Sequence, residues 1–509
     1  MGDENTVLSA PEIRHLLRRT SLGGAISETE VNSLLGQTRG QAADGLLAFK
    51  PDKYKPNGRD INKVHDAWIR KMLKTRKQLQ ERLVLFWHDH FATSDQVVQD
   101  PTQMALQNKL LRLHCKGIRR SDGTQGSFKD FVKAINKDPA MMDMLDTKRN
   151  SKSSPNENYA RELMELFTLG VFDSNGQPNY TQEDVSQVAR ALTGWRVNDR
   201  NEAFFNGGSG DTAGGTVCGS SRTGQHDYAA CWVSRGPKVI FKDSGGFGPA
   251  GRDFSVNGEG AAEIDTVVDI LFEHRDSDNQ VTAARYVGRR LFEHFAYANP
   301  PISVVDEIIS ASSFDTQFSV EAFLRVLFCH DQFYACAPAP GDGTQKSVRW
   351  PVDYVVGTLR RLRIKPKGTN LELLGGTYSN IRSHLENMGQ TLLEPPTVFG
   401  WDLEEGWLSS ATLLARYRFA ADIASAREGG AGSLRTERLI DLGLTDPGDI
   451  VDAVTTLLGV DDQLTEDEQL ALVTYLGPGP IDLFDYDIRN IKLHGLFALV
   501  LQSPAYQVY

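Results

Sequence analysis

The stretch from Ser153 to Gly170 holds the densest set of side chains that can transfer protons or bind a cation. At about 100° per residue, one helix face here is apolar and the other is polar. The polar face consists of Glu157, Asn158, Arg161, Glu162 and Glu165. Carboxylates grouped in this way can supply a general base or oxygen ligands for a metal.

The same residues also have an ordinary structural interpretation. Glu157, Arg161 and Glu165 follow one another at four-residue intervals, the spacing of ion pairs that stabilise a solvated helix by about 0.2–0.5 kcal/mol each. Periodicity leaves the two interpretations open. We predict a buried polar face, in which case Arg161→Ala would cost roughly 3–5 kcal/mol. Ser154 is the expected N-cap and Gly170 the expected end of the helix.

A second group of reactive residues is His88-Asp89-His90, at the end of an apolar stripe that starts at Leu79. A single histidine on such a stripe is usually a hydrogen-bonded core residue. His88 and His90 are candidate ligands for a divalent metal, but an unbroken helix would point them about 200° apart. The pair can share one metal only if the helix breaks at Trp87 or His88.

A third group, His226-Asp227, lies in a glycine-rich excursion. Residues 206–260 contain fourteen of the 46 glycines. An adjacent histidine and aspartate on a loop can act as a base and the group that orients it, or as ligands. A surface insertion stapled by a disulfide explains the segment equally well.

Two tryptophans, Trp401 and Trp407, surround a turn that begins at Glu394-Pro395-Pro396. They can form a platform on which a sugar stacks, or a hydrophobic lid between two parts of the molecule. We favour the lid.

The elements that must position these groups are helical. Apolar residues recur at helical spacing along most of the chain, and Thr181 with Asp184 marks a capped helix start. The predicted fold is therefore all-α, a large multi-helix globular fold with a glycine-rich irregular excursion and a small hairpin near Lys238–Phe241. We divide the chain into residues 1–205, 206–260 and 261–509, within one compact unit.

Composition excludes several classes of function. The net charge of -11 argues against nucleic acid as the main partner, because phosphate binding needs a basic surface. No apolar run is long enough for a transmembrane helix. Motifs of nucleotide-binding loops, serine-hydrolase elbows and zinc peptidases are also absent from the sequence.

The five cysteines, at 115, 218, 231, 329 and 336, fit no zinc signature. Two local disulfides with one free thiol, or five reduced thiols, are compatible with the spacing.

Together these blocks resemble the bacterial domain of unknown function 1800 family. The matching stretches run in the family's order and span almost the whole chain: His15 to Arg19, Trp87 to Thr93, Asp138 to Met141, Pro155 to Gly170, Ala191 to Trp195, His226-Asp227 and Glu394 to Trp401. The resemblance implies a mostly helical, usually exported protein, periplasmic or secreted, whose signal peptide is absent from this chain. Family members often stand beside genes for sulfatase-like proteins, which points to extracellular polymers and to a sulfatase-like neighbour as partners.

Two functions follow as expectations. The first is a hydrolytic enzyme, metal-assisted or not, that acts on an extracellular polysaccharide or other polymer. The second is a non-catalytic binding or assembly protein of the cell surface, in which the same polar residues form a buried network.

Two further expectations concern geometry. His88 or His90, His226-Asp227 and the 157–165 carboxylates should converge on one pocket, because proton transfer and metal binding require close contact. With export, Cys218–Cys231 and Cys329–Cys336 should form disulfides and Cys115 should stay free.

Overall fold

The fold is mostly α, as the sequence predicts. A computed structural model describes residues 3–22, 28–52, 54, 56, 58–117, 126–207, 225–227, 238–242, 252–253, 260–335, 347–366, 371, 373, 380–401, 404–425 and 433–509. The described part contains 24 α-helices and two sheets of two strands each. None of its helices is long and apolar enough to cross a membrane.

The first half of the chain forms a set of helices that includes the central helix α5, against which α1 and α7 pack. The helices of this set are α1 (Ala10–Thr20), α2 (Glu28–Leu34), α3 (Arg39–Leu47), α4 (Ile61–Lys74), α5 (Gln78–His90), α6 (Asp95–Val98), α7 (Pro101–His114), α8 (Phe128–Ile135), α9 (Pro139–Met144), η2 (Thr147–Arg149), α10 (Glu157–Glu162), η3 (Leu163–Thr168) and α11 (Gln182–Ala191). In α5 every residue from Leu79 to His90 is buried. A helix buried on all sides is typical of the core of a large protein.

The rest of the chain adds two further sets of helices. The first is η4 (Gly260–Ala262), α12 (Glu263–Leu271), α13 (Thr282–Phe295), α14 (Ile302–Ser312), α15 (Phe314–Gln317), α16 (Val320–Cys329) and α17 (Asp331–Tyr334). The second is α18 (Pro351–Arg361), α19 (Ile381–Asn387), η5 (Glu404–Trp407), α20 (Ser410–Ser425), η6 (Thr436–Arg438), α21 (Pro447–Leu458), α22 (Glu466–Leu476), η7 (Ile488–Leu493), α23 (His494–Gln502) and α24 (Pro504–Gln507).

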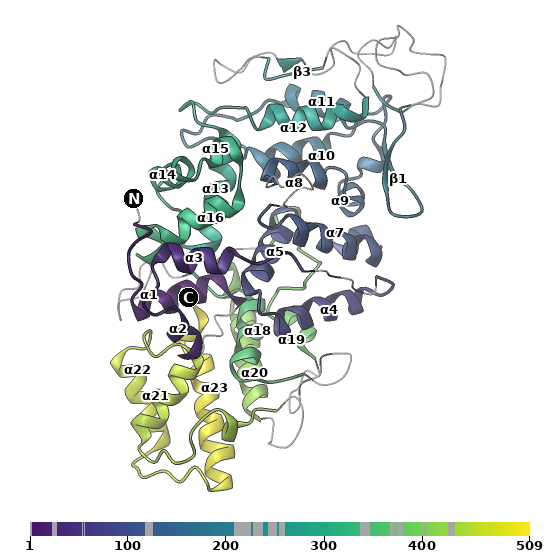
Figure 1. The fold of residues 1–509 in the computed structure, drawn as a ribbon. Coiled ribbons are helices and arrows are strands. Elements are labelled where there is room, and N and C mark those ends of the chain that lie inside the picture. Colours follow the sequence, from purple (N-terminus) through teal and green to yellow (C-terminus); the bar gives the residue numbers. More distant parts are fainter. Residues whose placement is uncertain are drawn as a thin grey trace.

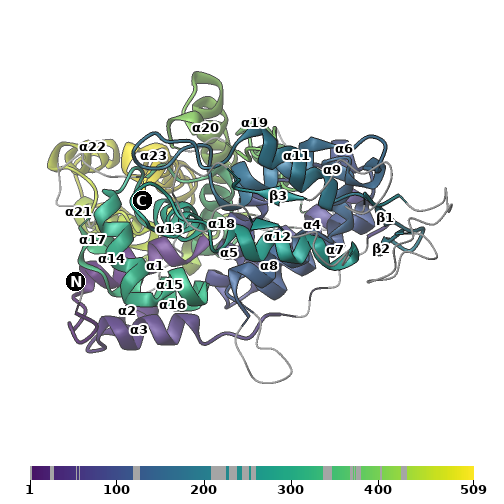
Figure 2. The same ribbon diagram turned by 90° about the horizontal axis from the view of Figure 1, so that it is seen from above.

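The helices form an elongated body. In Figure 1, α10 to α12 lie towards one end, α20 to α23 towards the other, and α5 between them. Seen from above in Figure 2, α1 to α3 and α14 to α17 lie on one side, with α7, α9 and strand β1 (Trp195–Val197) on the other. Residues far apart in the sequence therefore meet at α5.

The strands of the described residues lie just before the glycine-rich excursion, 206–260, and within it. Strand β1 (Trp195–Val197) pairs antiparallel with β2 (Ala203–Phe205), with Trp195 opposite Phe205. Strand β3 (Val239–Ile240), where the hairpin was predicted, pairs antiparallel with β4 (Arg252–Asp253).

Helix α10 starts later than predicted and changes geometry as it continues. Its N-cap is Asn156, not Ser154, because Ser151 and Ser154 pair in a turn that keeps Ser154 outside the helix. From Leu163 the chain winds as the π-helix η3, and Gly170 follows with a φ of +75°. The helix that starts after Thr181 has the predicted capping box with Asp184.

The cysteines differ from the expectation in one respect. Cys329, at the end of α16, is a free, buried thiol, so the predicted Cys329–Cys336 disulfide is wrong. Cys115 is also free and buried. Cys218, Cys231 and Cys336 lie outside the described residues.

Candidate active site around Asp89

The last three residues of helix α5, His88, Asp89 and His90, lie in three different environments. His88 packs edge-on against Trp68 and Trp401, with ring centroids 5.5 and 5.3 Å away. The Nε2 atom of His90 lies 3.2 Å from the carbonyl oxygen of Phe167, on the other side of the helix. Asp89, between the two, is directed towards a cavity.

His88 and His90 could share one metal only if the helix broke at Trp87 or His88, and the structure does not meet this condition. Helix α5 is unbroken through His90, so His88 and His90 leave it in different directions. Burial and the neighbouring His65 lower the pKa of His88 to about 3, and burial and Arg290 hold the pKa of His90 well below its usual value. Among the described residues, no group of three or more His, Cys, Asp or Glu side chains could hold a metal ion.

Asp89 is fixed by contacts from two distant segments. Its Oδ1 accepts a hydrogen bond of 2.7 Å from the backbone N–H of Trp401, and its Oδ2 lies 3.4 Å from Arg290. Gly400 makes this approach possible: its φ is +89°, and a Cβ there would lie 2.2 Å from Asp89 Oδ1. Burial raises the pKa of Asp89 to about 6, although Arg290 and the Trp401 N–H oppose the change.

The cavity at Asp89 has a volume of about 320 Å³. That is at the lower end of the range for small-molecule sites. Its charged lining comes from four arginines and two carboxylates: Arg19, Arg82, Asp89, Arg289, Arg290 and Glu293. Phe86, Val348, Trp350 and Tyr509 supply apolar and aromatic surface.

Two of the four pocket arginines, Arg82 and Arg19, are buried and held in place by their own contacts. Arg82 is buried and donates to Asp353 at 2.8 Å and to the Tyr509 hydroxyl at 3.1 Å. Arg19 is also buried and donates to the Phe295 carbonyl oxygen at 2.6 Å. The guanidinium groups are thus rigidly positioned before any ligand binds.

The polar face of α10 is only partly buried. The side chains of Glu157 and Arg161 are each 39% exposed, and they bind polar side chains of α11. Glu162 is buried, one of its carboxylate oxygens lacks a partner, and burial together with Glu165 raises its pKa to about 7. Glu165 accepts a hydrogen bond of 2.9 Å from the hydroxyl of Tyr180.

This segment does not line the pocket, but its backbone is connected to the pocket residue Arg290 through Tyr286. The Tyr286 hydroxyl donates to the Leu166 carbonyl at 3.0 Å, and Arg290 donates to that hydroxyl at 3.4 Å. The next carbonyl, of Phe167, contacts His90. Both carbonyls belong to the π-helical turn η3, a geometry often found at functional sites.

His226 and Asp227 belong to a different polar cluster. His226 Nδ1 lies 2.7 Å from the Thr193 carbonyl oxygen, and its Nε2 lies 3.2 Å from both Glu263 and Lys238. The side chains of His226, Lys238 and Glu263 are fully buried, and Asp227 pairs with Arg190 at 2.9 Å. The contacts described here connect His226 to α12 and to the residues before β3, not to the pocket at Asp89.

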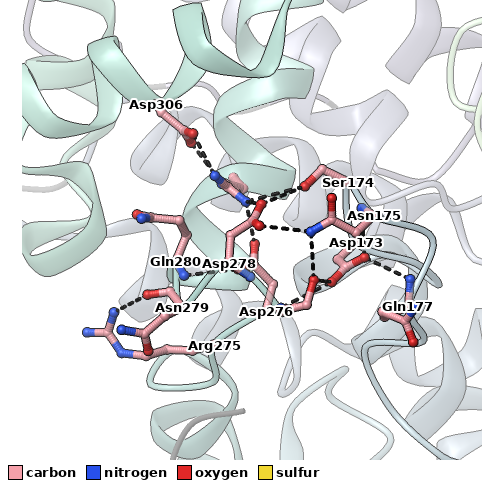
Figure 3. Close-up of polar contacts among 12 residues, drawn as sticks. Asp173, Ser174, Asn175, Gln177, Arg275, Asp276, Asp278, Asn279, Gln280 and Asp306 are labelled. Carbon is pink, nitrogen blue, oxygen red and sulfur yellow. Dashed lines mark hydrogen bonds and ion pairs between the residues drawn. The ribbon is translucent and has the colours of Figure 1, made fainter.

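A further group of carboxylates joins two loops, as Figure 3 shows. Arg285 donates to Asp276, Asp278 and Asp306 at 2.6–2.9 Å, and Asn175 donates to Asp278 at 2.8 Å. The hydrogen bond of Asn175 fastens the loop after η3 to the loop before α13, and the ion pairs of Arg285 fasten that second loop to α13 and α14. We assign them to structure.

The tryptophans near the turn at 394–401 are buried. Trp401 and Trp407 are 4% and 3% exposed and pack against Trp350, with centroids 6.4 and 5.9 Å away. Their burial favours the packing interpretation over an open sugar platform.

Sequence reasoning missed most of the pocket. It did not select Asp89, although both neighbours were selected, and it used Arg19 only as part of a stretch that resembles the family. The pattern Arg289-Arg290 followed by Glu293-His294 is the one available signal, since i and i+4 residues share a helix face.

The comparisons with known proteins define the class of this chain. A family model described as "Protein of unknown function (DUF1800)" matches residues 10–508. The chain belongs to this family, as its motifs predict. Searches of curated proteins and of solved structures found no match.

Proposed function

We propose that the protein is a hydrolytic enzyme that acts on an extracellular polymer, and that the pocket at Asp89 is its active site. The observation that carries the proposal is a buried carboxyl group, Asp89, in the wall of a cavity that has a second carboxylate, Glu293. Hydrolysis by general acid and base uses such a pair. The polymer and the location outside the cytoplasm, periplasmic or secreted, rest on the family resemblance.

The two carboxyl groups take different roles. Asp89, whose pKa is raised to about 6, is protonated for part of the time near neutral pH and donates a proton to the leaving group. Glu293 lies 3.0 Å from Arg289 and accepts a proton from the attacking water.

The test is hydrolysis of a panel of bacterial acidic and neutral polysaccharides, followed as new reducing ends. Asp89→Asn and Glu293→Gln should each lower the rate by at least about a hundredfold. Arg149→Gln, at a side chain that is 78% exposed, is the matched control and should retain the rate. An Asp89→Asn protein that hydrolyses as fast as the unmodified protein would refute the assignment.

The second candidate is a non-catalytic binding or assembly protein. It is favoured by the sealed His226–Lys238–Glu263 cluster, since a polar network without solvent access fixes packing rather than performs chemistry. Tight polymer binding with no new reducing ends across the whole panel would support this function and contradict the first.

A further inference from the structure

The lining of the pocket is unusual in its charge. Four arginine side chains and two carboxylates line it, and a third carboxylate, Asp353, pairs with Arg82 from behind, so the arginines exceed the carboxylates by one. Arg289 pairs with Glu293 at 3.0 Å and Arg290 with Asp89 at 3.4 Å, which uses both carboxylates. A pocket with excess positive charge concentrates anions, and low-dielectric walls strengthen the effect.

Buried nitrogen atoms in the lining also lack partners. Arg82 is 2% exposed and its Nε has no hydrogen-bond partner, and the Nε2 of His294 is likewise buried and unpaired. A buried donor left without a partner is unfavourable, so the Nε–H of Arg82 is suited to a ligand that accepts hydrogen bonds.

The other side of the pocket is aromatic and uncharged. Phe86 and Trp350 line it, and Trp350 is 6% exposed and lies edge-on to His294 with centroids 5.4 Å apart. Broad apolar surface combined with a few fixed polar groups is the pattern of a site for a ring-sized ligand.

We infer that the pocket binds a single sugar-sized unit carrying an oxyanion, a carboxylate or a sulfate ester, with Arg82 and Arg290 holding the anion and Trp350 facing the ring. This inference rests on the proposed function for the statement that the bound unit is part of a substrate. The anion binding itself depends only on the pocket.

The experiment is calorimetric titration at fixed ionic strength with three probes: glucuronate, N-acetylglucosamine 6-sulfate and uncharged glucose. At least one charged probe should bind at least about tenfold more tightly than glucose, and the comparison of the two identifies the anion. Equal affinity for charged and uncharged probes, or no binding of either charged probe, would overturn the inference.

Variants connect the binding to the pocket. Arg290→Gln should weaken binding of the charged probe by at least about tenfold, whereas Arg149→Gln should leave it unchanged. Arg290 is the better choice because Arg82 is part of a buried ion pair with Asp353 whose loss would disturb folding. Unchanged binding in a folded Arg290→Gln protein would overturn the assignment.

Failure of the inference and failure of the proposed function are distinguishable. An Asp89→Asn protein that still binds the charged probe but no longer hydrolyses polymer supports both. Charged-probe binding without hydrolysis by the unmodified protein removes the proposed function alone. Hydrolysis confined to neutral polymers removes the inference alone.

Discussion

At the scale of single residues, environment decides what each ionisable group can do. Asp89 and Glu162 are both buried carboxyls with raised pKa values, of about 6 and 7. Asp89 lines a cavity, whereas the contacts of Glu162 are with Glu165 and Arg161 on its own helical segment. The cavity beside Asp89 gives it room for a reacting molecule.

Arg161→Ala should cost less than about 1 kcal/mol of unfolding free energy, because exposed ion pairs contribute little. The Arg161–Glu157 ion pair is 3.7 Å long and joins two half-exposed side chains. The small expected cost therefore replaces the cost of about 3–5 kcal/mol that a buried polar face would give. Denaturant unfolding measures it. Arg112→Ala is the control: it breaks a fully buried pair with Glu81 and should cost about 3–5 kcal/mol. A cost of 3 kcal/mol for Arg161→Ala would contradict the assignment.

Asp138 should make the protein less stable as the pH rises. Burial raises the pKa of this carboxyl to about 7, above its ordinary value near 3.8. Between these two values the folded state keeps a proton that the unfolded state releases, so stability falls by up to about 1.4 kcal/mol per pH unit and levels off above pH 7.

Asp138→Asn should remove this decline, since asparagine can still accept the N-cap hydrogen bond from Met141 at the start of α9. Unfolding free energies measured from pH 4 to pH 8 test it. Parallel curves for the two proteins would show that Asp138 does not titrate in this range.

At the scale of elements, the site depends on a turn that closes against a helix. The turn at 397–400 brings the Trp401 N–H onto Asp89, and the π-helical turn η3 directs two carbonyls towards Tyr286 and His90. Both features are departures from regular helix, and each supports one side of the pocket.

Gly400→Ala should destabilise the protein by about 2–5 kcal/mol, the combined cost of a left-handed φ and of steric overlap with Asp89. Gly36→Ala is the matched control. Its φ is +81° but nothing lies within 4 Å of the added Cβ, so only the backbone cost of about 1–2 kcal/mol should appear. Equal effects of the two changes, measured by thermal unfolding, would argue against close contact at Asp89.

At the scale of the whole molecule, buried ion pairs join segments that are far apart in the chain. Arg82 of α5 pairs with Asp353 of α18, and Lys238 pairs with Glu263 of α12, with all four side chains buried. Such pairs cost desolvation energy when they form. Removing one partner nevertheless lowers the folding stability strongly, because it leaves a buried charge without its counter-charge.

Lys238→Met should therefore cost about 3–5 kcal/mol, and the double change with Glu263→Gln should cost clearly less than the sum of the single changes. Urea unfolding of the four proteins in this cycle measures the coupling. Additive effects would mean that the cluster around His226 is not held together by this pair.

The sequence by itself determined the helical class, the family, the capped start after Thr181 and the positions of the polar blocks. These depend on local spacing, and local spacing reports which residues share a helix face. The three blocks were expected in one pocket, but the described contacts put His226 with α12 and leave Glu157 half-exposed.

Only the tertiary structure could show that Asp89, rather than His88 or His90, is the candidate catalytic residue. Its position depends on contacts with Trp401 and Arg290, which lie more than 200 residues away in the chain. The pocket is lined from α1, α5, α13, the residues before α18 and Tyr509. Helical periodicity fixes the direction of a side chain around its own axis, but packing decides which face meets which helix, and so which charges meet.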